Sequence, residues 1–203
     1  MKDTVTDVGT ALGHSYSVTG TTPAKASNSI LATRETVIIQ GYTTHACSKC
    51  GDTYNDNYTD ISLEEFQREV AQATIKYINL YRAEQGDTAA TYLPRFTLVA
   101  EYRAVQLSTN FSHDTSDFRK AFGYYQYGKW IDMTQYGGTD QYYSANAKEA
   151  IALGTYSGTA DRVGELFATA FRESQNHWNY VGDSKYIYIG VGTYFDDVTG
   201  CWY

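Results

Sequence analysis

Two of the four histidines lie where their side chains could do chemistry. His113 follows a predicted helix in the run FSHD, and His177 ends another in the run SQNH. Their spacing alone defines no metal motif, because the chain has no HExxH and no two histidines one helical turn apart. A histidine at the C-terminus of a helix also gains from the helix dipole without any function. On these residues alone, a surface or capping role is the favoured interpretation of both.

The cysteines form a second candidate. Cys47, Cys50 and Cys201 are too few for a disulfide-stapled scaffold. Cys47 and Cys50 have the spacing of half a zinc site or of a small redox loop, and either His14 or His45 could complete a site with them. A local disulfide is an equal alternative, and free thiols without function are a third. Cys201 has no evident partner.

Composition limits the classes of function. The chain has 203 residues, 42% apolar, 19% charged and 15% aromatic, the last mostly through 20 tyrosines. It therefore differs from disordered chains and is typical of an extracellular surface. The net charge of −7, with scattered Lys and Arg, excludes an electrostatic footprint for nucleic acid or anionic lipid. No apolar run is long enough to span a membrane.

The chain divides after residue 60. Residues 1–60 are rich in Thr, Ser, Gly and Asn and predict a loop-rich, cysteine-containing appendage with at most a hairpin or two, including a β-prone run at 36–39. Residues 61–203 predict one α+β domain. Its first helix begins at a capping box formed by Ser62 and Glu65, carries apolar residues at helical spacing, and stops at Gly86.

Further elements follow along the domain. We expect helices at Arg95–Leu107 and Ala160–His177, a short helix at Ala145–Leu153, and irregular structure with a short strand at Phe122–Tyr143. The closing run YIYIGVGTYF predicts a central strand, in which two glycines allow close packing. Helices joined by irregular segments and closed by strands fit a three-layer α–β–α arrangement.

Five strings of the sequence resemble, in order and spacing, the CAP superfamily, which groups cysteine-rich secretory proteins, antigen 5 and plant pathogenesis-related proteins with bacterial secreted proteins. The bacterial branch matches best. The matching residues are Asn79 and Arg82 in the first helix, His113 after the second, Glu149 to Gly154, Ser174 with His177, and Ile189 to Gly192.

The resemblance implies a CAP-like α–β–α sandwich whose cleft is lined by His113, His177 and Glu149, although Ala150 replaces the usual asparagine of that segment. Ser174 stands where eukaryotic members often have a second glutamate. Glu173 lies four residues before His177 and could share a helical face with it, its other interpretation being a solvated surface acid.

Two imidazoles and a carboxylate in one cleft can bind a divalent cation such as zinc, or act as an acid–base pair. The resemblance therefore favours a secreted binding or interaction module for a small molecule, lipid, glycan or protein. The alternative is a metal-assisted hydrolase or peptidase-like enzyme in the same cleft. A third interpretation is a structural cell-surface domain whose tyrosine-rich exterior makes the contacts.

The string GYTTHACSKCGDTY resembles a small module of secreted proteins from gut-type Gram-positive bacteria. Such modules usually carry a further cysteine near the position of Arg34, and its absence weakens a four-ligand zinc site. The start, MKDTVTDVG, lacks the regions of a signal peptide. Either the protein is cytosolic or a signal has been removed; both resemblances favour a secreted or cell-surface protein.

Overall fold

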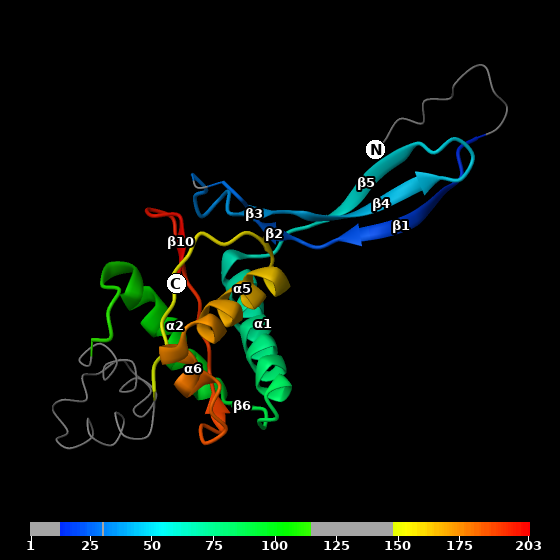
Figure 1. Ribbon diagram of the computed structural model, residues 1–203. Coiled ribbons are helices and arrows are strands. Elements are labelled where there is room, and N and C mark those ends of the chain that lie inside the picture. Colours follow the sequence, from blue (N-terminus) through cyan, green and yellow to red (C-terminus); the bar gives the residue numbers. More distant parts are fainter. Residues whose placement is uncertain (1–12, 30, 115–147) are drawn as a thin grey trace. The chain divides into compact units, whose positions relative to one another are not determined.

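The computed structural model describes residues 13–29, 31–114 and 148–203 and shows a mixed α+β chain (Figure 1). It divides into two compact units. One, here called the strand unit, comprises Met1–Ala24 and Gln40–Asp60; the other, the helical unit, comprises Lys25–Ile39 and Ile61–Tyr203. The sequence predicts a single boundary after residue 60, whereas the segment at 25–39 belongs to the helical unit.

The strand unit is a three-stranded antiparallel sheet in the order β1-β4-β5. Its strands are Tyr16–Thr22 (β1), Gly41–Cys47 (β4) and Thr53–Thr59 (β5). This sheet is more regular than the predicted hairpins. The threonines that mark the region as loop by composition are β-branched, and they suit a pleated strand.

The segment 25–39 supplies two short strands to the helical unit. Lys25–Ala26 (β2) pairs with Ile38–Ile39 (β3), which lies in the predicted β-prone run, and with Gly158–Thr159 (β7). Ala26 and Val37 are buried in the main apolar cluster of the unit. These residues therefore help to form the core of the helical unit.

The first predicted helix is confirmed as Leu63–Glu84 (α1). The Ser62 hydroxyl accepts the backbone N–H of Glu65 at 3.1 Å, as the capping box requires. At the other end, Gly86 adopts a φ of 83°, and the Asp87 amide donates to the Arg82 carbonyl at 2.9 Å. A left-handed residue with such a bond is a standard helix stop.

The second predicted helix is also confirmed, as Pro94–Thr109 (α2), and proline is well placed at its first turn. The third is interrupted. Ala160–Glu173 (α5) ends at Ser174, whose extended backbone (φ −94°, ψ 107°) precedes a separate helix, Gln175–Val181 (α6). The prediction of one helix to His177 is therefore wrong. Serine readily leaves helical geometry. The Trp178 amide then donates to the Ser174 carbonyl at 2.8 Å, which is the first helical hydrogen bond of α6.

The predicted short helix before Gly154 is not found in the described residues. The part of the predicted helix Ala145–Leu153 that the structure describes, 148–153, is not helical, and Gly154 instead exchanges two backbone hydrogen bonds with Trp202. Residues 145–147 and the predicted irregular region Phe122–Tyr143 lie outside the described residues.

The closing run is not a continuous central strand. Tyr188–Ile189 (β8) pairs in parallel with Thr91–Tyr92 (β6), and Phe195–Asp196 (β9) pairs with Cys201–Trp202 (β10). The close packing expected at its glycines is confirmed. A Cβ on Gly192 would lie 2.0 Å from the Glu101 amide nitrogen in α2, and one on Gly190 would lie 2.4 Å from the Phe96 carbonyl carbon. Backbone contact this close replaces sheet pairing over the middle of the run.

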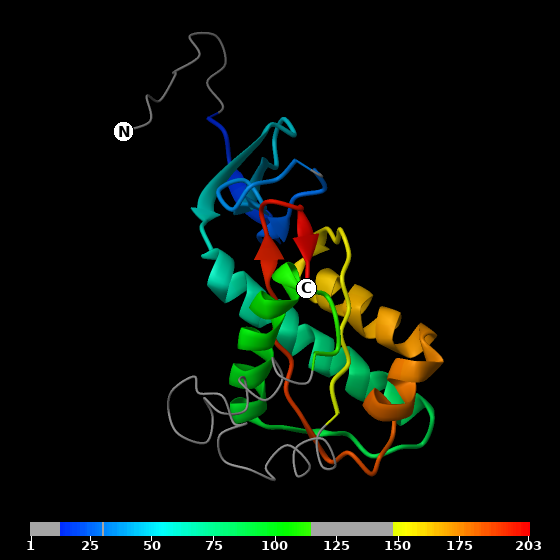
Figure 2. The same ribbon diagram turned by 90° about the vertical axis from the view of Figure 1, so that its left-hand side faces the viewer.

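The core of the helical unit forms where α1 and α5 lie side by side, as Figures 1 and 2 both show. Phe66 and Val70 of α1 pack with Val163 and Phe167 of α5, and Trp202 closes the cluster. The three-layer sandwich itself stays a prediction. Within the described ranges, no helix has the length and apolar character needed to cross a bilayer.

We predict that Phe167→Ala lowers the free energy of unfolding by about 3–5 kcal/mol, because this ring is 3% exposed and its removal leaves a cavity between the helices. Denaturant melts of the parent and the variant measure the difference. A loss well below 1 kcal/mol would show that the α1–α5 contact does not support the fold.

Candidate functional site

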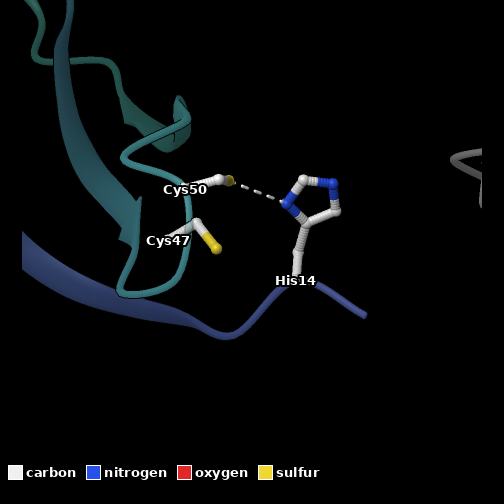
Figure 3. A group of neighbouring side chains, drawn as sticks. All are labelled: His14, Cys47 and Cys50. Carbon is white, nitrogen blue, oxygen red and sulfur yellow. Dashed lines mark hydrogen bonds between the residues drawn. The ribbon is translucent and has the colours of Figure 1, made fainter. Parts of the chain in front are cut away.

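His14, Cys47 and Cys50 come together at one end of the strand unit. The pairing of β1 with β4 sets Tyr16 opposite Cys47, so His14, two residues earlier, reaches the turn between β4 and β5. Cys47 and Cys50 both lie at this turn, and Figure 3 shows the imidazole facing the two sulfurs. His14 Nδ1 is 3.3 Å from Cys50 Sγ, and the three potential ligand atoms lie within 4.8 Å of one another.

Backbone geometry fixes the two sulfurs. The Gly51 amide donates to the Cys47 carbonyl at 2.9 Å, and the Cys47 amide donates to the Asp52 carbonyl at 2.8 Å. Gly51 has a φ of 77°, a conformation that suits glycine. The turn therefore holds both cysteines on the side that His14 approaches.

The environment favours a thiolate at Cys47. Its pKa is lowered to about 6, because the backbone amide of Ser15 and then those of Lys49 and Cys50 hydrogen-bond to the sulfur, against the opposing effect of burial. The Ser15 nitrogen is 3.4 Å from Sγ. The pKa of Cys50 is raised: the Asp52 amide lowers it, but the hydrogen bond with Cys47 and burial outweigh that effect. A thiolate is the form of cysteine that binds metals.

The group His14, Cys47 and Cys50 can therefore hold a metal ion. Around a tetrahedral zinc, bond lengths of about 2.3 Å to sulfur and 2.1 Å to nitrogen put the ligand atoms about 3.5–3.8 Å apart. The distance of 3.3 Å between His14 Nδ1 and Cys50 Sγ is near this range, and the limit of 4.8 Å for all three atoms leaves about 1 Å for the ligands to close on an ion. His45, the other predicted ligand, lies elsewhere: its Nε2 is 2.8 Å from Asp56 Oδ1 and its ring stacks on Tyr54.

In the helical unit, the structure places His113 beside Glu149. His113 Nδ1 is 3.4 Å from Glu149 Oε2, although the two residues come from the loop after α2 and from the segment before Gly154. The other carboxylate oxygen, Oε1, lies 2.6 Å from Nε of Arg103. Only 4% of the Arg103 side chain and 13% of the Glu149 side chain are exposed. A buried ion pair thus holds the carboxylate that faces His113.

Sequence reasoning missed Arg103, although a signal for it was present. Arg103 follows Val99 by four residues and precedes Leu107 by four residues, so all three lie on one face of α2. That face is buried, and Arg103 places a charge on it. Its Nη2 donates to the Ser112 carbonyl at 2.5 Å, which ties down the loop that carries His113. The contact with Glu149 is an ion pair without good hydrogen-bond alignment, and Nη1 has no hydrogen-bond partner within the described chain.

His177 lies near this group on α6. Its ring packs edge-on against Phe171 at 5.6 Å. Burial lowers the pKa of His177, and the nearby charge of His113 lowers it further. The charge of His113 thus reaches the ring of His177.

The remaining predicted cleft residues are placed less favourably. Ser174 is half-buried at the break between α5 and α6 and makes no capping bond. Glu173 is exposed, and the helical face that it was predicted to share with His177 does not form because the helix breaks between them. Within residues 13–29, 31–114 and 148–203, His113, Glu149 and His177 do not form a metal-ligating group as the His14 group does.

A cavity of about 310 Å³ lies in the helical unit beside the Arg103–Glu149 pair. Its wall is mainly apolar and comes from α1, α2, α5 and the closing segment, as in ligand pockets of this size. Arg103 and Glu149 belong to the wall, whereas His113 and His177 do not. Glu149 therefore contacts His113 through one carboxylate oxygen and also lines the cavity.

No protein-family model, no curated protein and no solved structure matches this chain.

We predict that Glu149→Gln lowers the free energy of unfolding by about 3–5 kcal/mol, because it leaves the Arg103 charge buried without a partner. The matched control is Glu173→Gln on exposed α5 surface, for which we expect a change within about 0.5 kcal/mol. Denaturant melts compare the two variants. Equal effects would mean that the ion pair does not hold the segment around Glu149.

We predict that His177 titrates below the ordinary histidine value of about 6.5, and that His113→Ala raises its pKa part of the way back. The unfolded chain then binds more protons than the folded chain between the two pKa values. The contribution of His177 to stability is therefore present above about pH 6.5 and lost as the pH falls through its folded pKa. NMR of the imidazole Cε1–H signals measures both values, and a midpoint at or above 6.5 would contradict the burial of the ring.

Proposed function

We propose that this chain is an extracellular, CAP-type binding module of a Gram-positive bacterium, with a three-layer α–β–α domain that binds a small ligand at His113, Glu149 and His177. The observation that carries the proposal is that His113 lies 3.4 Å from Glu149, from which it is distant in sequence, and that its charge reaches His177. All three residues belong to the strings that resemble that superfamily. The tyrosine-rich composition with little charge supports an extracellular location.

The geometry gives each residue a role in binding. Arg103 fixes the Glu149 carboxylate, and Glu149 orients the ring of His113 through Nδ1. When Nδ1 carries the proton, Nε2 is left as an acceptor for a ligand. His177 is held neutral at physiological pH by its lowered pKa and offers a second uncharged imidazole. The adjoining cavity can accept an apolar part of the ligand.

An enzyme in the same cleft is the second candidate. Within the described residues, no serine hydroxyl or cysteine thiol is hydrogen-bonded to His113 or His177, so an activated nucleophile of that kind is not formed. Glu149 already contacts Arg103 and His113, which suits a positioning residue better than a free general base. Turnover that depends on Glu149 and both histidines would favour the enzyme.

We test ligand binding with a library of small organic acids, amides and monosaccharides, observed by NMR at the His113 and His177 ring signals. We expect the fragments that bind to perturb both rings and to lose binding in His113→Ala/His177→Ala, while the fold survives. The exposed variant Glu173→Gln serves as the control and should bind as the parent does. Binding retained in the double variant would contradict this site.

We propose zinc as the metal of the His14 group. Two thiolates and one imidazole are a soft donor set that zinc prefers over calcium or magnesium. In the strand unit, such an ion would join the segment before β1 to the β4–β5 turn. Apart from Cys47, no apolar side chain among the described residues of this unit is fully buried, so a metal would supply a cross-link that packing does not.

We predict that zinc binding, measured by calorimetry and elemental analysis under reducing conditions, is lost in Cys47→Ser/Cys50→Ser. It should be unchanged in His45→Ala, whose ring lies on the same sheet but is bonded to Asp56. The variant His113→Ala/His177→Ala should also keep its zinc. If zinc were lost only in His113→Ala/His177→Ala, the metal would belong to the helical unit instead.

A further inference from the structure

The strand unit provides three metal ligands and no fourth among its described residues. Every other histidine or acidic side chain at 13–24 and 40–60 is engaged elsewhere. His45 contacts Asp56, Asp52 accepts the Tyr16 hydroxyl at 2.6 Å, and Asp60 accepts the side-chain amide of Gln40. The group of close ligand atoms therefore contains His14, Cys47 and Cys50 alone within the part of the chain that the structure describes.

The position of the group leaves one side accessible. His14 and Cys50 are exposed, and only Cys47 is buried. Figure 3 shows both cysteine side chains on the side of the turn that faces the imidazole. Since two of the three ligands are exposed, an ion held between them could be reached from solvent. A structural zinc site is closed by four protein ligands, whereas a site with three ligands keeps a position for an exchangeable donor.

We propose that a metal ion held by His14, Cys47 and Cys50 keeps its fourth coordination position open to a donor from outside the chain, namely a histidine imidazole or a thiol. The inference rests on the metal binding proposed above. Two thiolates already cancel the charge of a divalent ion, so the position has little attraction for simple anions. An imidazole nitrogen, or a thiol that releases its proton to solvent and binds as the thiolate, matches the softness of the site instead.

The site is rigid enough to keep this geometry. Lys49 Nζ donates to the Gly13 carbonyl at 2.9 Å, and the Ser48 amide donates to the Ser15 carbonyl at 3.0 Å. The His14 ring stacks on Tyr16. These contacts tie the segment that carries His14 to the turn that carries the cysteines. The three ligands can therefore stay in place while the fourth donor exchanges.

The experiment uses the full chain, stripped of metal under reducing conditions and loaded with Co²⁺, whose visible bands report on coordination. We expect imidazole to shift the ligand-field bands in a saturable way while the sulfur-to-cobalt charge-transfer band is retained. A small thiol should produce a different saturable shift. His45→Ala should respond as the parent does, and Cys47→Ser/Cys50→Ser should lose the bands.

The outcomes separate this inference from the one on which it rests. Cobalt bands that depend on both cysteines but do not respond to imidazole or thiol would show a position closed by the chain, and would overturn the open site while the metal site stands. Loss of the charge-transfer band as imidazole is added would show extraction of the metal, which also contradicts an open position. Failure to bind cobalt at these cysteines would overturn both proposals.

Discussion

The helical unit depends on one buried cation. Arg82, at the end of α1, is 1% exposed, and its guanidinium donates to the backbone carbonyls of Thr88, Val181, Asp183 and Tyr186. A planar group with five donors can join several chain segments that lack regular pairing. Here it joins the end of α1, the loop after it, the end of α6 and the segment before β8. Burial lowers the pKa of Arg82, but an arginine stays charged in proteins.

Asn79, one turn earlier on α1, extends this arrangement. Its side chain accepts the Ala90 amide at 2.8 Å and donates to the Ala90 carbonyl at 3.1 Å, so it mimics a strand partner just before β6. Since β6 pairs with β8, the two polar residues of α1 fix both strands of that pair. Arg82 also holds the end of α6, the helix that carries His177, through the Val181 carbonyl. The position of His177 thus follows from contacts that it does not make itself.

The same logic extends to His113. Arg103 binds Glu149 and the Ser112 carbonyl, so one side chain of α2 orders both the loop before His113 and the segment that faces it. The buried pair has a cost, because both charges leave water, and the protein recovers it only if neither partner is removed. A polar network of this kind specifies one arrangement of the irregular segments, whose short strands have little pairing of their own.

The elements that sequence predicts well are those set by local chemistry. The ends of α1 follow from the Ser62–Glu65 cap and from Gly86, which act within one turn of the chain. The failures lie where distant contacts decide. Gly190 and Gly192 allow the closing run to lie against the α2 backbone, so its alternating pattern does not become a long strand.

The functional residues divide in the same way. Cys47 and Cys50 are visible as a pair in the sequence, but the choice of His14 over His45 depends on the register of β1 against β4. Arg103 is visible only as a charge on an apolar face of α2, and its partner Glu149 comes 46 residues later in the sequence. Spacing alone cannot show that the two meet, because tertiary packing brings them together.

The two units differ in how much apolar surface they bury, and this difference affects how much a metal ion would stabilise the strand unit. The helical unit buries large aromatic side chains such as Phe66 and Trp202 between its helices. In the strand unit the two edge strands, β1 and β5, are largely exposed. Its aromatic contacts form a row of rings from His14 through Tyr16 to Tyr54 and His45. A small sheet without a core gains little from burial.

The end of that aromatic row is where His14 meets the cysteines. A metal there would close the sheet at the point where β1 begins and β4 turns into β5, joining residues 33 or more positions apart in sequence. Joining such distant residues removes more freedom from the unfolded chain than a bridge between Cys47 and Cys50, which closes only a short loop. On this argument a metal ion held there would stabilise the strand unit more than the competing local disulfide would, even with one coordination position left to an outside donor.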